Sequence, residues 1–167
     1  MQSKTSCFNG ALLRKNLTRF WPLWAVYAVA WLLAGPVARF VAAFGRYAEP
    51  DRIFRAAELT RDLLSTWSSF GLFCAVVAGI LFAMALFSYL TVPRAVGLFH
   101  SLPVRREGLF LTNYLTGLLV VVAVQVTCAV LEALVLLSAG ALGGTALLSA
   151  LACGLGQMLF FYSFGVL

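Results

Sequence analysis

The chain has 167 residues, of which 62% are hydrophobic and 11% are charged, and its formal net charge is +6. A soluble domain is nearer half apolar and a quarter charged, and a small domain leaves much of its surface in water. The composition therefore excludes a water-soluble domain and predicts an integral membrane protein with about four α-helical spans. The charges fall outside the apolar runs, so a positive-inside bias explains them and no nucleic-acid partner is expected.

The segment before the first apolar run is basic and has no acidic residue. Its cations are Lys4, Arg14, Lys15 and Arg19. Over residues 10–24 the large apolar side chains recur at helical spacing on one face, namely Leu13, Leu17, Phe20, Trp21 and Trp24. This pattern favours an amphipathic helix that lies in the membrane interface. The alternative is that these are ordinary flanking charges of the first span.

The first span is predicted over residues 21–44. Pro22 lies near its start, where a missing N–H costs little. Gly35 and Pro36 together predict a kink or an early end. The Arg39 side chain is expected to extend along the helix to the far interface.

The most polar part of the chain is the stretch 45–69, in which four arginines offset four acidic residues. Pro50 can open a short helix that runs to about Ser65. We expect an external loop with a solvated surface helix, because charge runs are commonly solvated faces. A substrate gate at this place is the alternative.

Three further spans are predicted, over residues 70–90, 109–137 and 146–167. In the second span small residues repeat every four positions, at Ala75, Gly79 and Ala83. Such a face lets two helices approach closely, and we favour packing within one bundle over dimerisation. The expected fold is a single all-α transmembrane domain, a bundle of about four helices preceded by the interfacial helix.

The charges of the loops predict an orientation. Three arginines against one glutamate give the loop 91–108 a net charge of +2, whereas the loops 45–69 and 138–145 have no net charge. Basic segments stay on the cytoplasmic side. We therefore expect a multi-pass protein of the cytoplasmic membrane, with its N-terminus and the loop 91–108 in the cytoplasm.

Most catalytic classes lack their residues in this sequence. His100 is the single histidine, and no metalloprotease, serine-hydrolase or Walker phosphate-loop motif occurs. The cysteines do not have metal-binding spacing and are expected to be small buried hydrophobes; they are Cys7, Cys74, Cys128 and Cys153. We expect no metal, no cofactor and no enzymatic activity in this chain, so that another chain must bind any ATP.

One acidic residue, Glu132, is embedded in an apolar run, and Gln125 lies one heptad earlier on the same helix face. An ionisable residue in a span is a functional candidate by default. A proton or substrate role is therefore one interpretation. The other is a packing role or an extended side chain that reaches water, because Glu132 comes late in the third span.

The loop 91–108 contains apolar residues that a plain basic loop does not explain. Val92, Val96 and Phe99 have helical spacing, and the neighbouring Leu98 and Leu102 are apolar too; Pro93 and Pro103 bracket the segment. Exposed apolar residues beside arginine are typical of a docking surface. We interpret the loop as a docking surface on the cytoplasmic side.

At this loop the sequence resembles the type-two ABC transporter permeases. The resemblance extends over residues 86–118, and its motif is His100-Ser101-Leu102-Pro103-Val104-Arg105-Arg106, followed by Asn113-Tyr114-Leu115. It implies that the loop contacts a separate ATP-binding cassette subunit. The residues assigned to this contact are Pro93, Arg94, Val96, Phe99, His100, Leu102, Pro103, Arg105 and Arg106.

The resemblance further implies a permease subunit, which we expect to be an exporter acting with a second copy or a related permease chain in the lipid bilayer. The family usually has about six spans, and the chain ends at Leu167 with no polar flank, so an N-terminal fragment is expected. The alternative function is a membrane scaffold or sensor-associated protein that docks another partner on the same loop. An intramembrane enzyme is disfavoured because Gln125 and Glu132 are the only polar candidates within the spans.

Overall fold

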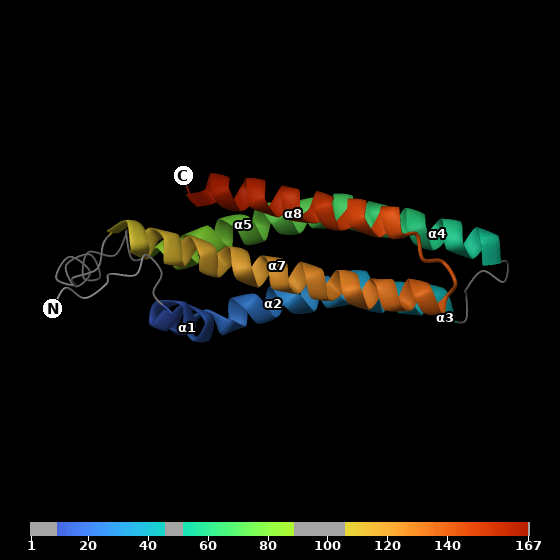
Figure 1. Ribbon diagram of the computed structural model, residues 1–167, viewed down its shortest axis with the longest axis horizontal. Coiled ribbons are helices and arrows are strands. Elements are labelled where there is room, and N and C mark those ends of the chain that lie inside the picture. Colours follow the sequence, from blue (N-terminus) through green and yellow to red (C-terminus); the bar gives the residue numbers. More distant parts are fainter. Residues whose placement is uncertain (1–9, 46–51, 89–105, 167) are drawn as a thin grey trace.

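The computed structural model describes residues 10–45, 52–88 and 106–166 of the chain. Four of its helices are long and apolar enough to cross a membrane, and they form an antiparallel bundle (Figure 1). The elements are α1 Gly10–Arg19, α2 Trp21–Leu32, the π-helical turn η1 Leu33–Val37, α3 Ala38–Phe44, α4 Arg52–Ser65, the π-helical turn η2 Thr66–Phe70, α5 Gly71–Phe87, α7 Arg106–Ser138 and α8 Gly144–Val166. The predicted all-α membrane bundle is confirmed, and the chain is a multi-pass membrane protein.

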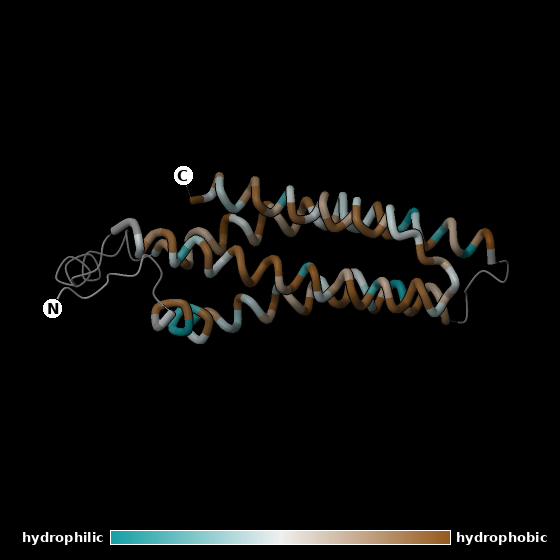
Figure 2. The backbone as a smooth tube through the Cα atoms, in the orientation of Figure 1, coloured by the Kyte–Doolittle hydropathy of each residue, from teal (hydrophilic) through white to brown (hydrophobic). Residues whose placement is uncertain are grey.

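The outer surface of the bundle is apolar, as a bilayer requires. Large hydrophobic side chains such as Val26, Met84, Leu134 and Phe164 are more than half exposed. Figure 2 shows hydrophobic residues along most of each long helix, with hydrophilic ones gathered in α1 and α4. Because lipid tails are as apolar as these side chains, their exposure carries no penalty in a membrane.

The first span runs from Trp21 to Phe44, with the predicted bounds, and it continues through Pro36. Proline lacks the N–H that an α-helix would use and crowds the preceding turn. Here Gly35 and Pro36 lie in η1, and a π-helical turn absorbs the irregularity without ending the helix. The early end is therefore not observed.

The second span is longer than its apolar core. Helix α4, the turn η2 and α5 follow one another without a break, so that one helix extends from Ile53 to Phe87. The expected surface helix is the first part of this element, and it packs on the bundle through the buried Leu59 and Leu63. No glycine or proline separates the two parts, which explains why the helix continues.

The small-residue face of the second span is a packing face within the bundle, as predicted. A Cβ atom added to Gly79 would lie 3.1 Å from backbone atoms of Phe161 and Tyr162 in α8. In the same contact, a Cβ on Gly165 of α8 would lie 3.2 Å from that of Ala83. Helices α5 and α8 therefore touch almost backbone to backbone, and Figure 1 shows them side by side.

Helix α1 lies across one end of the bundle, at an angle to α2 (Figure 1). The chain bends at Phe20, whose backbone leaves the helical region before α2 begins. The buried Asn16 then donates a hydrogen bond of 2.6 Å to the side chain of Asn113 in α7. This placement agrees with the predicted interfacial helix, and Asn16 ties it to the third span.

Candidate intramembrane polar site

The Glu132 carboxylate is completely enclosed by the helices of the bundle. Its side chain is 0% exposed, and Oε2 accepts a hydrogen bond of 2.7 Å from the indole Nε1 of Trp67. The other oxygen, Oε1, lies 4.0 Å from Nη2 of Arg39. Glu132 therefore does not reach out to water along the helix. It joins the third span to the first and the second.

Arg39 is also buried rather than extended to the interface, so this expectation was wrong. Its Nη2 atom donates a hydrogen bond of 2.8 Å to the backbone carbonyl of Asp62 in α4, while the Asp62 side chain is exposed. The carboxylate and the carbonyl offset part of the cost of burying the guanidinium, whose Nε has no hydrogen-bond partner among the described residues. The partners that hold Arg39 inward come from two other spans, which a single helix pattern cannot show.

The two π-helical turns meet at Glu132. Gly35 belongs to η1, and a Cβ atom at this position would lie 2.8 Å from Oε1 of Glu132. Trp67, which donates to Oε2, belongs to η2. Single π-helical turns are often found at functional sites. Here η2 supplies the indole donor to the carboxylate, and η1 supplies a glycine that leaves space for it.

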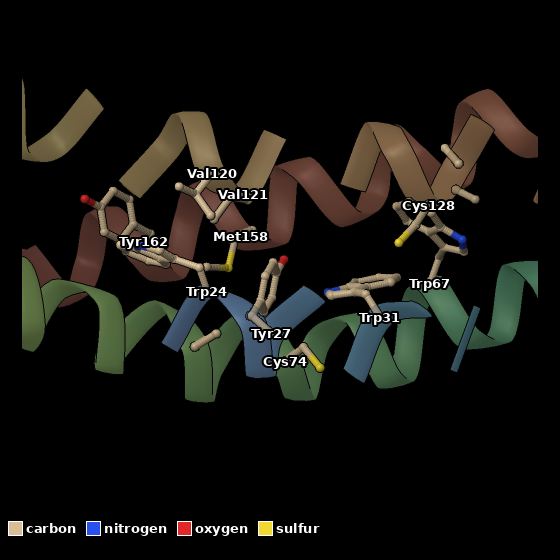
Figure 3. Close-up of a cluster of buried hydrophobic side chains, with 14 of the residues drawn as sticks. Trp24, Tyr27, Trp31, Trp67, Cys74, Val120, Val121, Cys128, Met158 and Tyr162 are labelled. Carbon is tan, nitrogen blue, oxygen red and sulfur yellow. The ribbon is translucent and has the colours of Figure 1, made fainter. Parts of the chain in front are cut away.

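The tryptophan that holds Glu132 is itself held by ring packing and by a glycine. Trp31 of α2 lies beside it with a ring-centroid distance of 4.7 Å, as Figure 3 shows. A Cβ atom on Gly154 of α8 would come within 2.6 Å of the Trp67 ring. Glycine at this position therefore lets the indole lie flat against α8, so that all four spans contribute to the site.

Gln125 is buried as well, about two turns away along α7. Its Nε2 atom is 3.2 Å from the Tyr27 hydroxyl and 3.4 Å from the backbone carbonyl of Gly154. Figure 3 shows Tyr27 pointing from α2 toward α7. The two predicted polar residues thus share the interior of the bundle, but no hydrogen bond joins them. Gly154 and Trp67 lie between them.

The contacts of Arg39 and Glu132 connect helices of the bundle to one another and do not line a described pocket. Arg39 and Glu132 carry opposite charges 4.0 Å apart, so that each offsets part of the cost of burying the other. An open groove of about 190 Å³ runs between α2 and α7, but its lining is Ala28, Leu32, Ala123, Val124, Thr127 and Cys128. Neither charged residue reaches this groove. The geometry favours the packing interpretation of Glu132 over a substrate role.

The predicted contacts to an ATPase subunit lie outside the described residues, except that α7 begins at Arg106. The motif residue Asn113 is buried and bonded to Asn16. Its neighbour Tyr114 has its hydroxyl 2.8 Å from that of Ser163 in α8. This part of the motif therefore joins the third span to α1 and to the fourth span.

Several members of the polar site were absent from the sequence-based candidates, which were Gln125 and Glu132; those missed are Tyr27, Gly35, Arg39, Trp67 and Gly154. Trp67 looked like one more aromatic residue, although it stands between Thr66 and Ser68 in a short polar stretch. Gly154 has no property of its own that indicates a site. The comparison of this chain with protein-family models, curated proteins and solved structures found no match.

Proposed function

We propose that this chain is a membrane-spanning permease subunit of an ATP-driven ABC transporter. It acts as an exporter, and its segment 91–108 binds a separate ATP-binding cassette subunit. The family named in this proposal rests on the resemblance of the motif between His100 and Arg106. The structural support for the proposal comes from one end of the bundle.

The observation that carries the proposal concerns one end of the bundle. Helix α1, the last turn of α5 and the first turn of α7 all lie at this end (Figure 1). The segment 91–108 follows α5 in the chain and runs into the first turn of α7. Arg14, Lys15 and Arg19 are exposed on α1, and this basic surface stands where the basic segment begins and ends. Positive charge gathered at one end is typical of the cytoplasmic side.

The contacts of α5 and α7 with the other helices would let a docked ATPase move the spans. Helix α5 packs closely on α8, and α7 contacts α1, α2, α3 and α8. A force on the segment between α5 and α7 therefore acts on two spans directly and on the others through their contacts. Two copies, or this chain with a related one, would rock against each other and alternate access to a path between them.

A pull-down from the native host in mild detergent tests the proposal. Stoichiometric partners of the tagged chain are identified by mass spectrometry, for the native chain and for the double variant Phe99→Ala/Arg105→Ala. We expect an ATP-binding cassette protein with the native chain and a loss of about tenfold or more with the variant, because apolar and arginine anchors dominate interfaces.

The matched control is Arg61→Ala, which removes an exposed arginine from α4 at the opposite end of the bundle. It should retain the partner in full. If no ATPase is recovered under conditions in which other transporters keep theirs, the permease proposal is contradicted. A different stoichiometric partner that depends on Phe99 would then favour a scaffold or sensor-associated protein.

A further inference from the structure

Helix α1 has an outward face that is entirely basic and polar. Arg14, Lys15, Thr18 and Arg19 are exposed, and α1 contains no acidic residue. The opposite face is fixed to the bundle through Asn16, which is bonded to Asn113. This bond and the apolar contacts fix the rotation of α1 about its own axis. The basic ridge, formed by Arg14, Lys15 and Arg19, therefore points away from the bundle.

The three cations of this ridge share one exposed face of α1. Lys15 and Arg19 are one helical turn apart and are neighbours on the helix surface, and Arg14 is one turn before Thr18 on the same face. The Thr18 hydroxyl between them donates to the backbone carbonyls of Arg14 and Lys15 at 3.1 Å. The hydroxyl is thereby occupied within the helix, and the binding groups of the ridge are the three cations.

An exposed aromatic residue adjoins the basic ridge. Trp21 begins α2, one residue after the bend at Phe20, and is 64% exposed. The Arg19 guanidinium lies 5.3 Å from the ring centroid of Phe20, which keeps this charge beside an apolar surface. Tryptophan at the end of a span lies at the level of the lipid headgroups, where its ring has apolar and polar neighbours.

The position of α1 in the bilayer determines which anions the basic ridge can contact. Trp21 is the first residue of a span, so α1 lies at the depth where the apolar core gives way to the headgroups. The phosphodiester is the anion that a bilayer offers at this depth. A headgroup with net negative charge gains more from three cations than a zwitterionic one, whose ammonium group they repel.

We propose that Arg14, Lys15 and Arg19 form a binding site for the phosphate of an anionic phospholipid, with the upper part of the lipid against Trp21. The site orders a lipid of one charge class at the junction of α1 and the first span. The proposal requires only that the chain spans a bilayer, so it stands or fails separately from the transporter proposal.

The experiment uses the full chain in neutral detergent with short-chain phosphatidylglycerol or phosphatidylcholine, and retained lipid is counted by native mass spectrometry. We expect the native chain to retain phosphatidylglycerol in preference. The triple variant Arg14→Gln/Lys15→Gln/Arg19→Gln should lose roughly fivefold in affinity for each charge removed, since each basic residue near an anionic surface contributes on that scale. Added salt should reduce the preference of the native chain.

Two control variants separate this site from general effects of charge or folding. Arg61→Gln, an exposed arginine of α4 at the other end of the bundle, should bind as the native chain does. Arg14→Lys/Arg19→Lys keeps the charge and should retain phosphatidylglycerol. Three results would overturn the proposal: equal retention of both lipids, unchanged retention by the triple variant, or displacement by inorganic phosphate as effective as that by the lipid.

Discussion

The two ends of the bundle use charged groups in different ways. At the end near α3 and α4, Arg39 and Glu132 are buried together and join three spans. At the end near α1, the described interhelical bonds at Asn16 and Tyr114 are made by neutral groups, and the cations of α1 point outward. Both ends therefore have exposed charges, but among the described residues only the end near α3 and α4 also buries an ion pair.

This difference predicts that the two ends respond unequally to the loss of one polar partner. Removing one partner of a buried ion pair costs about 3–5 kcal/mol, because the other charge is left without compensation. A hydrogen bond between polar side chains within a membrane is worth about 0.6 kcal/mol on average. Removing one polar partner should therefore cost more at the end near α3 and α4 than at the end near α1, and three single substitutions and one double variant test this contrast.

The largest expected effect is that of Arg39→Leu. It leaves the Glu132 carboxylate buried beside an apolar side chain and should lower the free energy of unfolding by about 3–5 kcal/mol. Thermal unfolding in detergent, followed by circular dichroism, measures the loss. Arg61→Leu is the matched control, and it should change the stability by less than about 0.5 kcal/mol because this side chain is exposed.

A double variant sharpens that comparison. Arg39→Leu/Glu132→Leu removes both charges, and replacing a buried ion pair by apolar residues is often neutral. The double variant should therefore be more stable than Arg39→Leu alone. If the two variants were equally unstable, the ion pair would not be the reason for the loss.

A smaller effect is expected for Trp67→Phe, which keeps an aromatic ring but removes the donor to Glu132. Hydrogen bonds to charged groups contribute about 1.5–3 kcal/mol, and the melting temperature should fall accordingly. Trp24→Phe is the control, since Trp24 is also buried while its Nε1 has no hydrogen-bond partner among the described residues. Equal losses in the two variants would mean that ring packing, and not the bond to Glu132, stabilises this end.

The smallest effect is expected for Asn16→Ala at the opposite end. It breaks the bond to Asn113 and should cost about 0.6 kcal/mol, while limited proteolysis at the N-terminal side of Trp21 becomes faster as α1 detaches. The control Thr18→Ala removes a hydroxyl that bonds only within α1 among the described residues, and it should leave the cleavage rate unchanged. Slower cleavage of Asn16→Ala would contradict the role of this bond.

The fold was predictable to a large extent because the bilayer imposes strong rules on a sequence. Apolar runs without charges marked the spans, and the first span has the predicted bounds from Trp21 to Phe44. The small residues at Gly79 and Ala83 correctly indicated a close helix contact. The helix from Ile53 to Phe87 was predicted as two elements, a surface helix and a separate span. The reason is that its first turns are polar, and polar residues were taken to mark a break between helices.

The polar site was predictable only in part, because its geometry depends on helix pairing. The sequence pointed to Gln125 and Glu132, since polar residues in an apolar run stand out. It could not show that Arg39 turns inward, because the carbonyl that it binds belongs to another span. Trp67 and Gly154 were missed for the same reason, as each matters through the residue that it faces.

The unbroken helix from Ile53 to Phe87 also has a consequence for movement across the membrane. Its 35 residues correspond to a rod of about 52 Å, well beyond the roughly 30 Å of a bilayer core. Both ends of this helix therefore extend past the apolar core, so that a tilt of the helix displaces groups on both sides of the membrane together.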